Sequence, residues 1–243
     1  MNIRTLMMAS ALVVLALPAL AADAPAPVPL LVRGTIASFD GKTVTITKAD
    51  GTAVTAAVGP TTFFAAVEPR RFDQLKATDF VGITAVPGPG DTLKAEEIHI
   101  LPIHVGEGSY PWDHHPGGGA VTAGSMTNGT VAVVHGGAPT TAGSMTNGTV
   151  TTTGGMSLKV TYRGSDMVNG KCVGHAPAAP TGGCTGVASV SVTPETQIVA
   201  IVPAKPTDPK PGLAVFAGAV TLPDGKVAVG SLVLEKNGIK PPM

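Results

Sequence analysis

The residue types that could bind a metal ion gather in the middle of the chain. Five of the six histidines lie between residues 104 and 175, and the methionines at 126, 145, 156 and 167 share this region. Imidazole and thioether groups together suit copper, and imidazole alone suits zinc or nickel. The histidines that could hold copper or zinc are His104, His114, His115, His135 and His175.

A flexible linker explains the same residues without a metal. Met126 and Met145 belong to two copies of one repeated segment, so they count as one observation. His114 and His115 are neighbours, and neighbouring side chains of an extended chain point to opposite faces. The glycines at 117–119 also make ordering the segment costly. The sequence therefore favours a polar linker without a cofactor, with metal binding as the alternative.

The segment "YPWD" at 110–113 contains the only tryptophan of the chain. Tyr110, Trp112 and Asp113 could either dock this segment against a folded domain or contact a ligand, and packing is the commoner use of such an indole. His99 lies between Ile98 and Ile100, which predicts that it faces solvent beside Glu97.

Enzymatic chemistry has little support in the sequence. The chain has no G-x-S-x-G elbow and no phosphate-binding glycine loop. We therefore expect a protein that is not an enzyme. A hydrolase without a recognisable motif is the alternative, because a site assembled from distant residues leaves no local pattern.

Charge and composition argue against nucleic-acid binding. Lys and Arg number 16, Asp and Glu also number 16, and aromatic residues make up 4%. A nucleic-acid interface needs a basic surface to neutralise phosphates, and single-strand binding needs aromatic platforms. The composition predicts neither, and the partner stays unspecified: an envelope protein or a small ligand.

The N-terminus predicts export. Arg4, the apolar run from Leu6 to Leu17 and "ALA" at 19–21 form the pattern of a secretory signal peptide, which we assign to residues 1–21. The run is too short to span a bilayer, so we expect no membrane span after cleavage. The protein should be periplasmic or secreted, where Cys172 and Cys184 would form a disulfide; two free thiols or a metal pair are the alternative.

The remainder of the chain predicts an all-β fold built from a duplicated unit. Residues 34–46 align with 148–160 without a gap, and 58–69 align with 192–203. Dipeptides such as Asp40-Gly41 predict type I′ hairpin turns between alternating strands. Only Phe72 to Ala77 suggests a helical turn.

We expect two tandem five-stranded OB-like barrels joined by a Gly-rich linker, with a single β-sandwich as the alternative. In such barrels a ligand lies across the second and third strands. The predicted segments are an N-terminal tail at 22–29, barrel one at 30–103, a linker at 104–146 and barrel two at 147–243, which carries an insertion at 166–185 with both cysteines.

The decamer "TAGSMTNGTV" occurs at 122–131 and again at 141–150. The alignment assigns the second copy to the first strand of barrel two and leaves the first copy as a duplication in the linker. Either copy could pair in the same register, so the two compete for one position.

The segment "GTIASFDGKTVTI", the core around Leu75, Asp79 and Val81, and the final strand "DTLKAEEIHI" resemble an exported bacterial repeat, the domain of unknown function 5666. The linker and the end "IKPPM" are similar to a proteobacterial subset of that family. The resemblance implies export and an OB-like β-barrel fold, and it brings no known activity. Thr78 replaces the glycine that is usual in the family. Together with the composition, this resemblance leads us to expect a non-catalytic binding or envelope-associated module.

Overall fold

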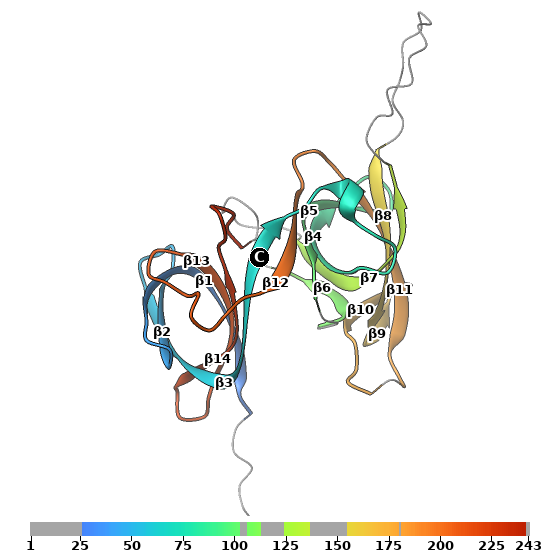
Figure 1. Cartoon of the computed structure of the whole chain (residues 1–243). Coiled ribbons are helices and arrows are strands. Elements are labelled where there is room, and N and C mark those ends of the chain that lie inside the picture. The colour runs from blue at the N-terminus through green and yellow to red at the C-terminus, as the bar shows by residue number, and fades with distance from the viewer. Residues whose placement is uncertain (1–25, 103–105, 113–123, 137–154, 180, 242–243) are drawn as a thin grey trace, which may run out of the picture.

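The computed structural model describes residues 26–102, 106–112, 124–136, 155–179 and 181–241, and these fold as an all-β structure (Figure 1). The single helical element among them is a short 3-10 helix, η1 (Phe72–Gln74), within the turn predicted there. The strands are β1 (Val28–Phe39), β2 (Thr43–Thr47), β3 (Ala53–Pro69), β4 (Phe80–Pro87), β5 (Thr92–Ile100), β6 (Gly108–Pro111), β7 (Ser125–His135), β8 (Met156–Gly164), β9 (Asp166–Val168), β10 (Lys171–His175), β11 (Cys184–Val192), β12 (Gln197–Pro203), β13 (Ala214–Thr221) and β14 (Val227–Leu234).

The strand pairings close into two rings of five strands, which lie side by side in Figure 1. The first ring runs β1-β2-β3-β14-β13 and returns to β1. The second ring runs β7-β8-β11-β5-β4 and returns to β7. Each ring encloses its own apolar core, centred on residues such as Ile46 and Leu232 in the first and Ile83 and Ile98 in the second.

The two rings exchange their last two strands. The β4–β5 hairpin follows β3 in the chain but completes the second ring, and the β13–β14 hairpin completes the first. These pairings differ from the sequence expectation, in which 30–103 and 147–243 each close on their own strands. The predicted linker 104–146 also contains β6 and β7, and β1 begins inside the predicted tail.

The exchange follows from the length of β3. This strand leaves the first ring and continues into an antiparallel pairing with β12, where Val67 lies opposite Ile201. Val67 and Ile201 are equivalent in the duplicated alignment, so the two halves of the chain meet there around a pseudo-twofold axis. A third apolar cluster, here called the seam, surrounds the crossing. Its buried residues are Ala65, Val67, Val199, Ile201, Phe216 and Val233.

The first copy of the decamer, not the second, supplies the first strand of the second ring. Val131 of β7 donates to the Asp79 carbonyl and accepts from Thr78, at 2.8 Å in both cases. Ile36 of β1 makes the equivalent pair of bonds in the first ring, to the residues Leu213 and Gly212. The assignment of the first copy to a spare linker duplication was therefore wrong. The second copy, 141–150, lies outside the described residues.

The preference for the first copy has a physical reason in the residues that follow it. Val131 is buried, and Val134 packs against the core of the second ring. The residues at the same places after the second copy are Val150 and Thr153. The first copy thus buries one more apolar side chain in the core.

The predicted turn at Asp40-Gly41 is present, although its type differs. Only Gly41 has a positive φ, of 88°, whereas a type I′ turn needs two such residues. The Asp40 carboxylate instead accepts hydrogen bonds from the backbone N–H groups of Lys42 and Thr43. These bonds lower the pKa of the Asp40 carboxyl.

The predicted insertion at 166–185 contains the small hairpin β9–β10. The disulfide between Cys172 and Cys184 is confirmed and ties β10 to the start of β11. β10 also pairs with β6, which pairs with β7. The insertion therefore extends the second ring beyond β7, and the described part of the first ring has no such extension.

Two matched deletions test whether the copies are interchangeable. Deleting 136–154 keeps the first copy, and deleting 122–140 keeps the second. In the first variant four residues connect Val134 of β7 to Leu158 of β8, and in the second variant four residues connect Thr153, at the place of Val134, to Leu158. We therefore expect both variants to fold. Shortening a connection of about 20 residues to 4 should stabilise the first variant by about 1.4 kcal/mol relative to the full chain. The second variant should be less stable than the first by about 1 kcal/mol, because threonine replaces Val134. Urea unfolding measures both differences. Failure of the 122–140 deletion to fold would contradict interchangeability.

A second prediction concerns Thr78, which has a φ of 84°. Its equivalent in the first ring is Gly212, with a φ of 92°. A β-branched residue is strained in this region, whereas glycine is not. We expect Thr78→Gly to raise the free energy of unfolding by about 1 kcal/mol. The control, Gly212→Ala, should lower the free energy of unfolding by a similar amount. A Cβ at Gly212 would contact nothing within 4 Å, so the substitution adds only backbone strain at a positive φ. If Thr78→Gly and Gly212→Ala changed the free energy of unfolding in the same direction, backbone strain at Thr78 would be refuted as the explanation.

Candidate functional site

A group of buried polar side chains lies on the outer face of β4, β5 and β7. We call Thr84, Glu97, His99 and Asn128 the polar cluster. Thr84 pairs with Glu97 across β4 and β5, and Gly82 pairs with both His99 and Asn128. Ile98, between Glu97 and His99, points into the core of the second ring, so its two neighbours point out of it.

The outer face of β5 is nevertheless closed to solvent. Glu97 is 2% exposed, His99 1% and Thr84 0%. The prediction that His99 faces solvent was therefore wrong. His99 pairs along β12 with Val199, a residue of the seam, so the exchange of hairpins turns this outer face toward the middle of the molecule.

Three atoms of the polar cluster lack the hydrogen bonds that buried polar atoms normally have. Thr84 Oγ1, Glu97 Oε2 and His99 Nε2 make no hydrogen bond to any residue in the described part of the chain. Glu97 Oε2 and His99 Nε2 lie 3.5 Å apart as an ion-pair contact. Leaving such atoms without hydrogen bonds costs about 1–3 kcal/mol each, and more for a charged group. The polar cluster therefore lowers the stability of the folded protein.

The first ring shows that the fold does not need these polar side chains. The strand pairing Gly82–His99 corresponds to Phe216–Val233, and Thr84–Glu97 corresponds to Gly218–Ser231. In the first ring, Phe216 and Val233 fill the seam with apolar contacts. Because the same fold tolerates apolar residues at these positions, we interpret the polar cluster as functional rather than structural.

Gly82 brings the two ends of the cluster together. A Cβ on Gly82 would lie 2.7 Å from Asn128 Oδ1 and 3.6 Å from His99 Nδ1. Any larger residue would collide with the Asn128 side chain, whereas Phe216 occupies the equivalent position in the first ring. The glycine thus leaves room for an amide and an imidazole to approach the same space.

Asn128 is fixed by the segment around β6. Its Nδ2 donates to the Gly106 carbonyl and to the Tyr110 hydroxyl, each at 2.9 Å. Burial raises the pKa of the Tyr110 phenol. Tyr110 also stacks on His175, with a distance of 3.9 Å between the centres of their aromatic rings. Tyr110 therefore joins the disulfide-bridged insertion to the polar cluster.

Trp112 docks the same segment against the first ring. Its indole lies 5.3 Å from the guanidinium carbon of Arg33, a cation–π distance. This contact fits the predicted use of Trp112 as a docking residue. Asp113, predicted with it, lies outside the described residues.

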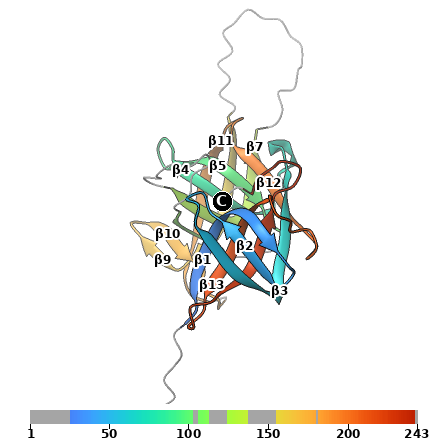
Figure 2. The same ribbon diagram turned by 90° about the vertical axis from the view of Figure 1, so that its left-hand side faces the viewer.

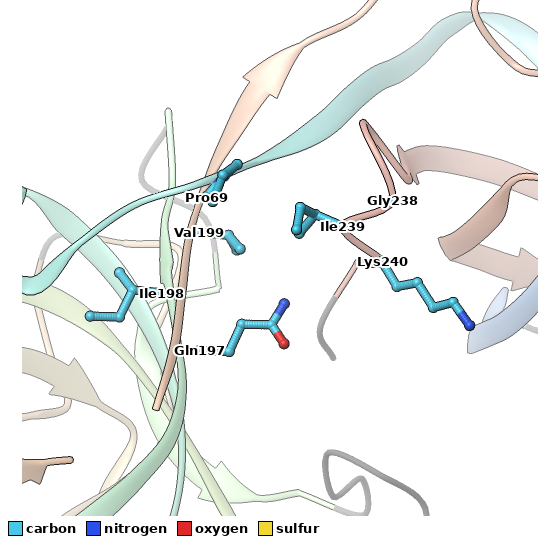
Figure 3. Close-up of a pocket in the computed structure, with 7 residues that line it drawn as sticks. All are labelled: Pro69, Gln197, Ile198, Val199, Gly238, Ile239 and Lys240. Atoms are coloured by element: carbon cyan, nitrogen blue, oxygen red, sulfur yellow. The ribbon is translucent and has the colours of Figure 1, made fainter. Parts of the chain in front are cut away.

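A pocket opens one strand away from the cluster (Figure 3). Its volume is about 330 Å³, and Figure 3 shows Gln197 directed into it while Ile239 faces Val199 across it. Gln197 and Val199 on β12 are the direct neighbours of Glu97 and His99 on β5. The C-terminal residues Gly238 to Lys240 form the opposite wall. The pocket is thus adjacent to the polar cluster in the sheet, although none of the four cluster residues lines it.

The histidines predicted as metal ligands are not brought together where the structure describes them. His135 ends β7, His175 ends β10, and both are exposed. His104, His114 and His115 lie outside the described residues. Within the described ranges, no group of three or more His, Cys, Asp or Glu side chains could hold a metal ion. The copper or zinc hypothesis for the linker stays a prediction.

The polar cluster was missed from the sequence because "EEIHI" has the alternation of a strand with one solvated face. The signal that could have revealed it was the comparison of Glu97 and His99 with Ser231 and Val233 in the aligned repeat. No protein-family model, curated protein or solved structure matches the chain. In the part of the chain that is described, no helix has the length and apolar character needed to cross a bilayer.

A double substitution tests whether the cluster is retained at a cost to stability. Glu97→Leu/His99→Leu replaces a buried carboxylate and the imidazole beside it with apolar side chains of similar volume. We expect the double variant to be more stable than the natural protein by about 1–4 kcal/mol in urea unfolding. His99→Leu alone should be destabilising by about 3–5 kcal/mol, because it leaves a buried carboxylate alone. A double variant less stable than the natural protein would mean that the cluster supports the fold.

Proposed function

We propose that this chain is an exported, non-catalytic binding module that holds a small hydrogen-bonding ligand against the polar cluster. The observation that carries the proposal is the set of three buried atoms, Thr84 Oγ1, Glu97 Oε2 and His99 Nε2, that lack hydrogen bonds to the described residues on one face of two paired strands. A ligand that satisfied these atoms would recover their lost hydrogen bonds.

The chemistry of the three groups specifies the ligand. The Glu97 carboxylate accepts hydrogen bonds, the Thr84 hydroxyl donates and accepts, and the His99 imidazole does either. The ligand must therefore carry at least one donor for Glu97, such as an ammonium, amide or hydroxyl group. The pocket beside the cluster, on the neighbouring strand β12, has a volume of about 330 Å³, which is at the lower end for small-molecule sites and favours a compact solute.

The architecture supports a binding role. We infer that each ring is an OB-like barrel, because each closes five strands in the same order and the exchanged hairpin fills the fourth and fifth positions in both. The proposed site lies on the fourth and fifth strands, β4 and β5, rather than on the second and third as OB-like barrels suggested. The reason is the seam, which exists only because these two strands were exchanged between the rings.

The disulfide and the surroundings of His99 support the two remaining parts of the proposal, export and a non-catalytic role. A disulfide is stable in an oxidising compartment, which supports a periplasmic or secreted protein, as the N-terminal pattern and the resemblance to domain of unknown function 5666 imply. Both cysteines form that disulfide, so neither is a free thiol that could act as a nucleophile. Among the described residues no hydroxyl hydrogen-bonds to His99 Nε2, so the Glu97–His99 pair lacks the nucleophile that acyl transfer requires.

Saturation-transfer NMR with three probes tests the proposal. Ethanolamine, glycinamide and glycerol present an ammonium, an amide and hydroxyl groups. We expect at least one probe to bind the natural protein saturably and to bind Glu97→Leu/His99→Leu at least tenfold more weakly, because the variant lacks the acceptor and the imidazole.

His135→Ala is the matched control, since His135 is exposed at the end of β7 and pairs there with Ser157 of β8 rather than with β4 or β5. It should bind the probe as the natural protein does. Equal binding by the natural protein and the double variant, or no binding of any probe, would contradict a ligand site at the polar cluster.

A further inference from the structure

The two rings differ at one strand edge. In the second ring, residues 125–128 of β7 pair with β4 on one edge and with β6 on the other. In the first ring, residues 28–35 of β1 pair with β13 on one edge. No strand among the described residues pairs with the opposite edge of residues 28–34, because β2 begins its pairing at Thr35.

The backbone of Leu31 faces this open edge. Ile36 directs both its N–H and its carbonyl toward the β13 side, to Leu213 and Gly212. Backbone groups alternate between the two edges of a strand, so residues 30, 32 and 34 bond toward β13 and residues 29 and 31 face the other way. Leu31 therefore offers a donor and an acceptor, and Pro29 offers an acceptor.

The side chains at this edge agree with the backbone. Leu31 is equivalent to Met126 of β7, which lies opposite Tyr110 of β6. Met126 is 3% exposed, whereas Leu31 is 43% exposed and Val28 63%. The apolar position that lies opposite β6 in the second ring is thus buried, and its equivalent in the first ring is exposed.

We propose that the open edge of β1 binds an extended strand of a partner protein in antiparallel orientation, with an aromatic residue of that strand opposite Leu31. The molecule itself provides the precedent, since β6 occupies the equivalent edge with Tyr110 opposite Met126. The last bond of that arrangement runs from Trp112 N–H to the Gly124 carbonyl at 3.0 Å. Gly124 corresponds to Pro29, whose carbonyl can accept the same bond although it has no N–H.

The edge is continuous with the seam. The guanidinium carbon of Arg33, a residue within the open stretch, lies 5.4 Å from the centre of the Phe216 ring and also faces the Trp112 indole. A strand added at Leu31 would therefore extend an interface that already joins the two rings. Strand addition of this kind draws its affinity from main-chain hydrogen bonds and its specificity from alternate side chains.

A second copy of this chain fits the edge less well. Antiparallel self-pairing about Leu31 would place Pro29 of one copy opposite Arg33 of the other. A hydrogen-bonded pair needs an N–H from both residues, and proline has none. Self-pairing therefore loses one bond in each of its two Pro29–Arg33 pairs, whereas a strand bound in the manner of β6 meets Pro29 only once.

The test uses a fluorescein-labelled peptide with the sequence of residues 106–112, GEGSYPW, titrated into the full chain and followed by anisotropy. We expect saturable binding with amide NMR shifts centred on Leu30 to Arg33. Leu31→Pro should weaken binding roughly tenfold or more, because it removes the outward N–H. The β1–β13 ladder should survive, since Pro29 already occupies a position of the same orientation.

Two controls separate the possible outcomes. Leu31→Ala keeps the N–H and should weaken binding less than Leu31→Pro, while Val187→Lys, at an exposed position on β11, should leave it unchanged. No binding to the natural protein, or equal binding to Leu31→Pro, overturns the proposal. Sedimentation of the chain alone tests whether a second copy of the chain occupies the edge. A dimer that dissociates on Leu31→Pro would assign the edge to a second copy and overturn the proposal of a partner strand.

Discussion

The antiparallel crossing of β3 and β12 is the constraint on which the rest of the structure depends. β3 continues beyond the first ring, β12 follows β11 of the second ring in the chain, and the two strands pair around the equivalent residues Val67 and Ile201. Once a third strand has passed this crossing, the hairpin that follows it emerges beside the opposite ring. The reciprocal exchange of β4–β5 and β13–β14 is thus a consequence of strand length and one pairing. Figure 2 shows β13 beside β1, whereas β4 and β5 lie near β7 and β11.

The crossing of β3 and β12 also buries part of the ring surface that points away from the ring's own core. In an isolated ring, the residues alternating with the core would meet solvent, and a polar residue there would cost nothing. The crossing places part of that face against the seam, where a carboxylate and an imidazole lose their water. Glu97 and His99 are therefore ordinary in sequence and costly in the folded molecule. Costs of this kind persist where a function requires them.

The sequence was sufficient for the features set by local chemistry. Alternation and Asp-Gly pairs located the strands and turns, the aligned repeats identified equivalent positions, and two cysteines in a chain with a signal-peptide pattern predicted the disulfide. It was insufficient where two segments carry the same local information. The hairpins at 80–100 and 214–234 share one pattern, so the pattern cannot say which ring each completes. The two decamers are identical, and only the residues after them, such as Val134 and Thr153, distinguish their burial.

Duplication also supplies a way to separate fold from function within one molecule. Positions that the fold requires should carry compatible residues in both rings, as Gly34 and Gly129 do: a Cβ on either would collide with a backbone carbonyl oxygen of the neighbouring strand. Positions that differ without affecting the fold reveal what one ring has acquired. By this criterion the second ring has gained the polar cluster, β6 and the bridged insertion, and the first ring has kept an edge of β1 with which no strand of the described residues pairs. The two proposed binding surfaces thus arise from the same asymmetry, one as an added group of side chains and the other as a strand position left open.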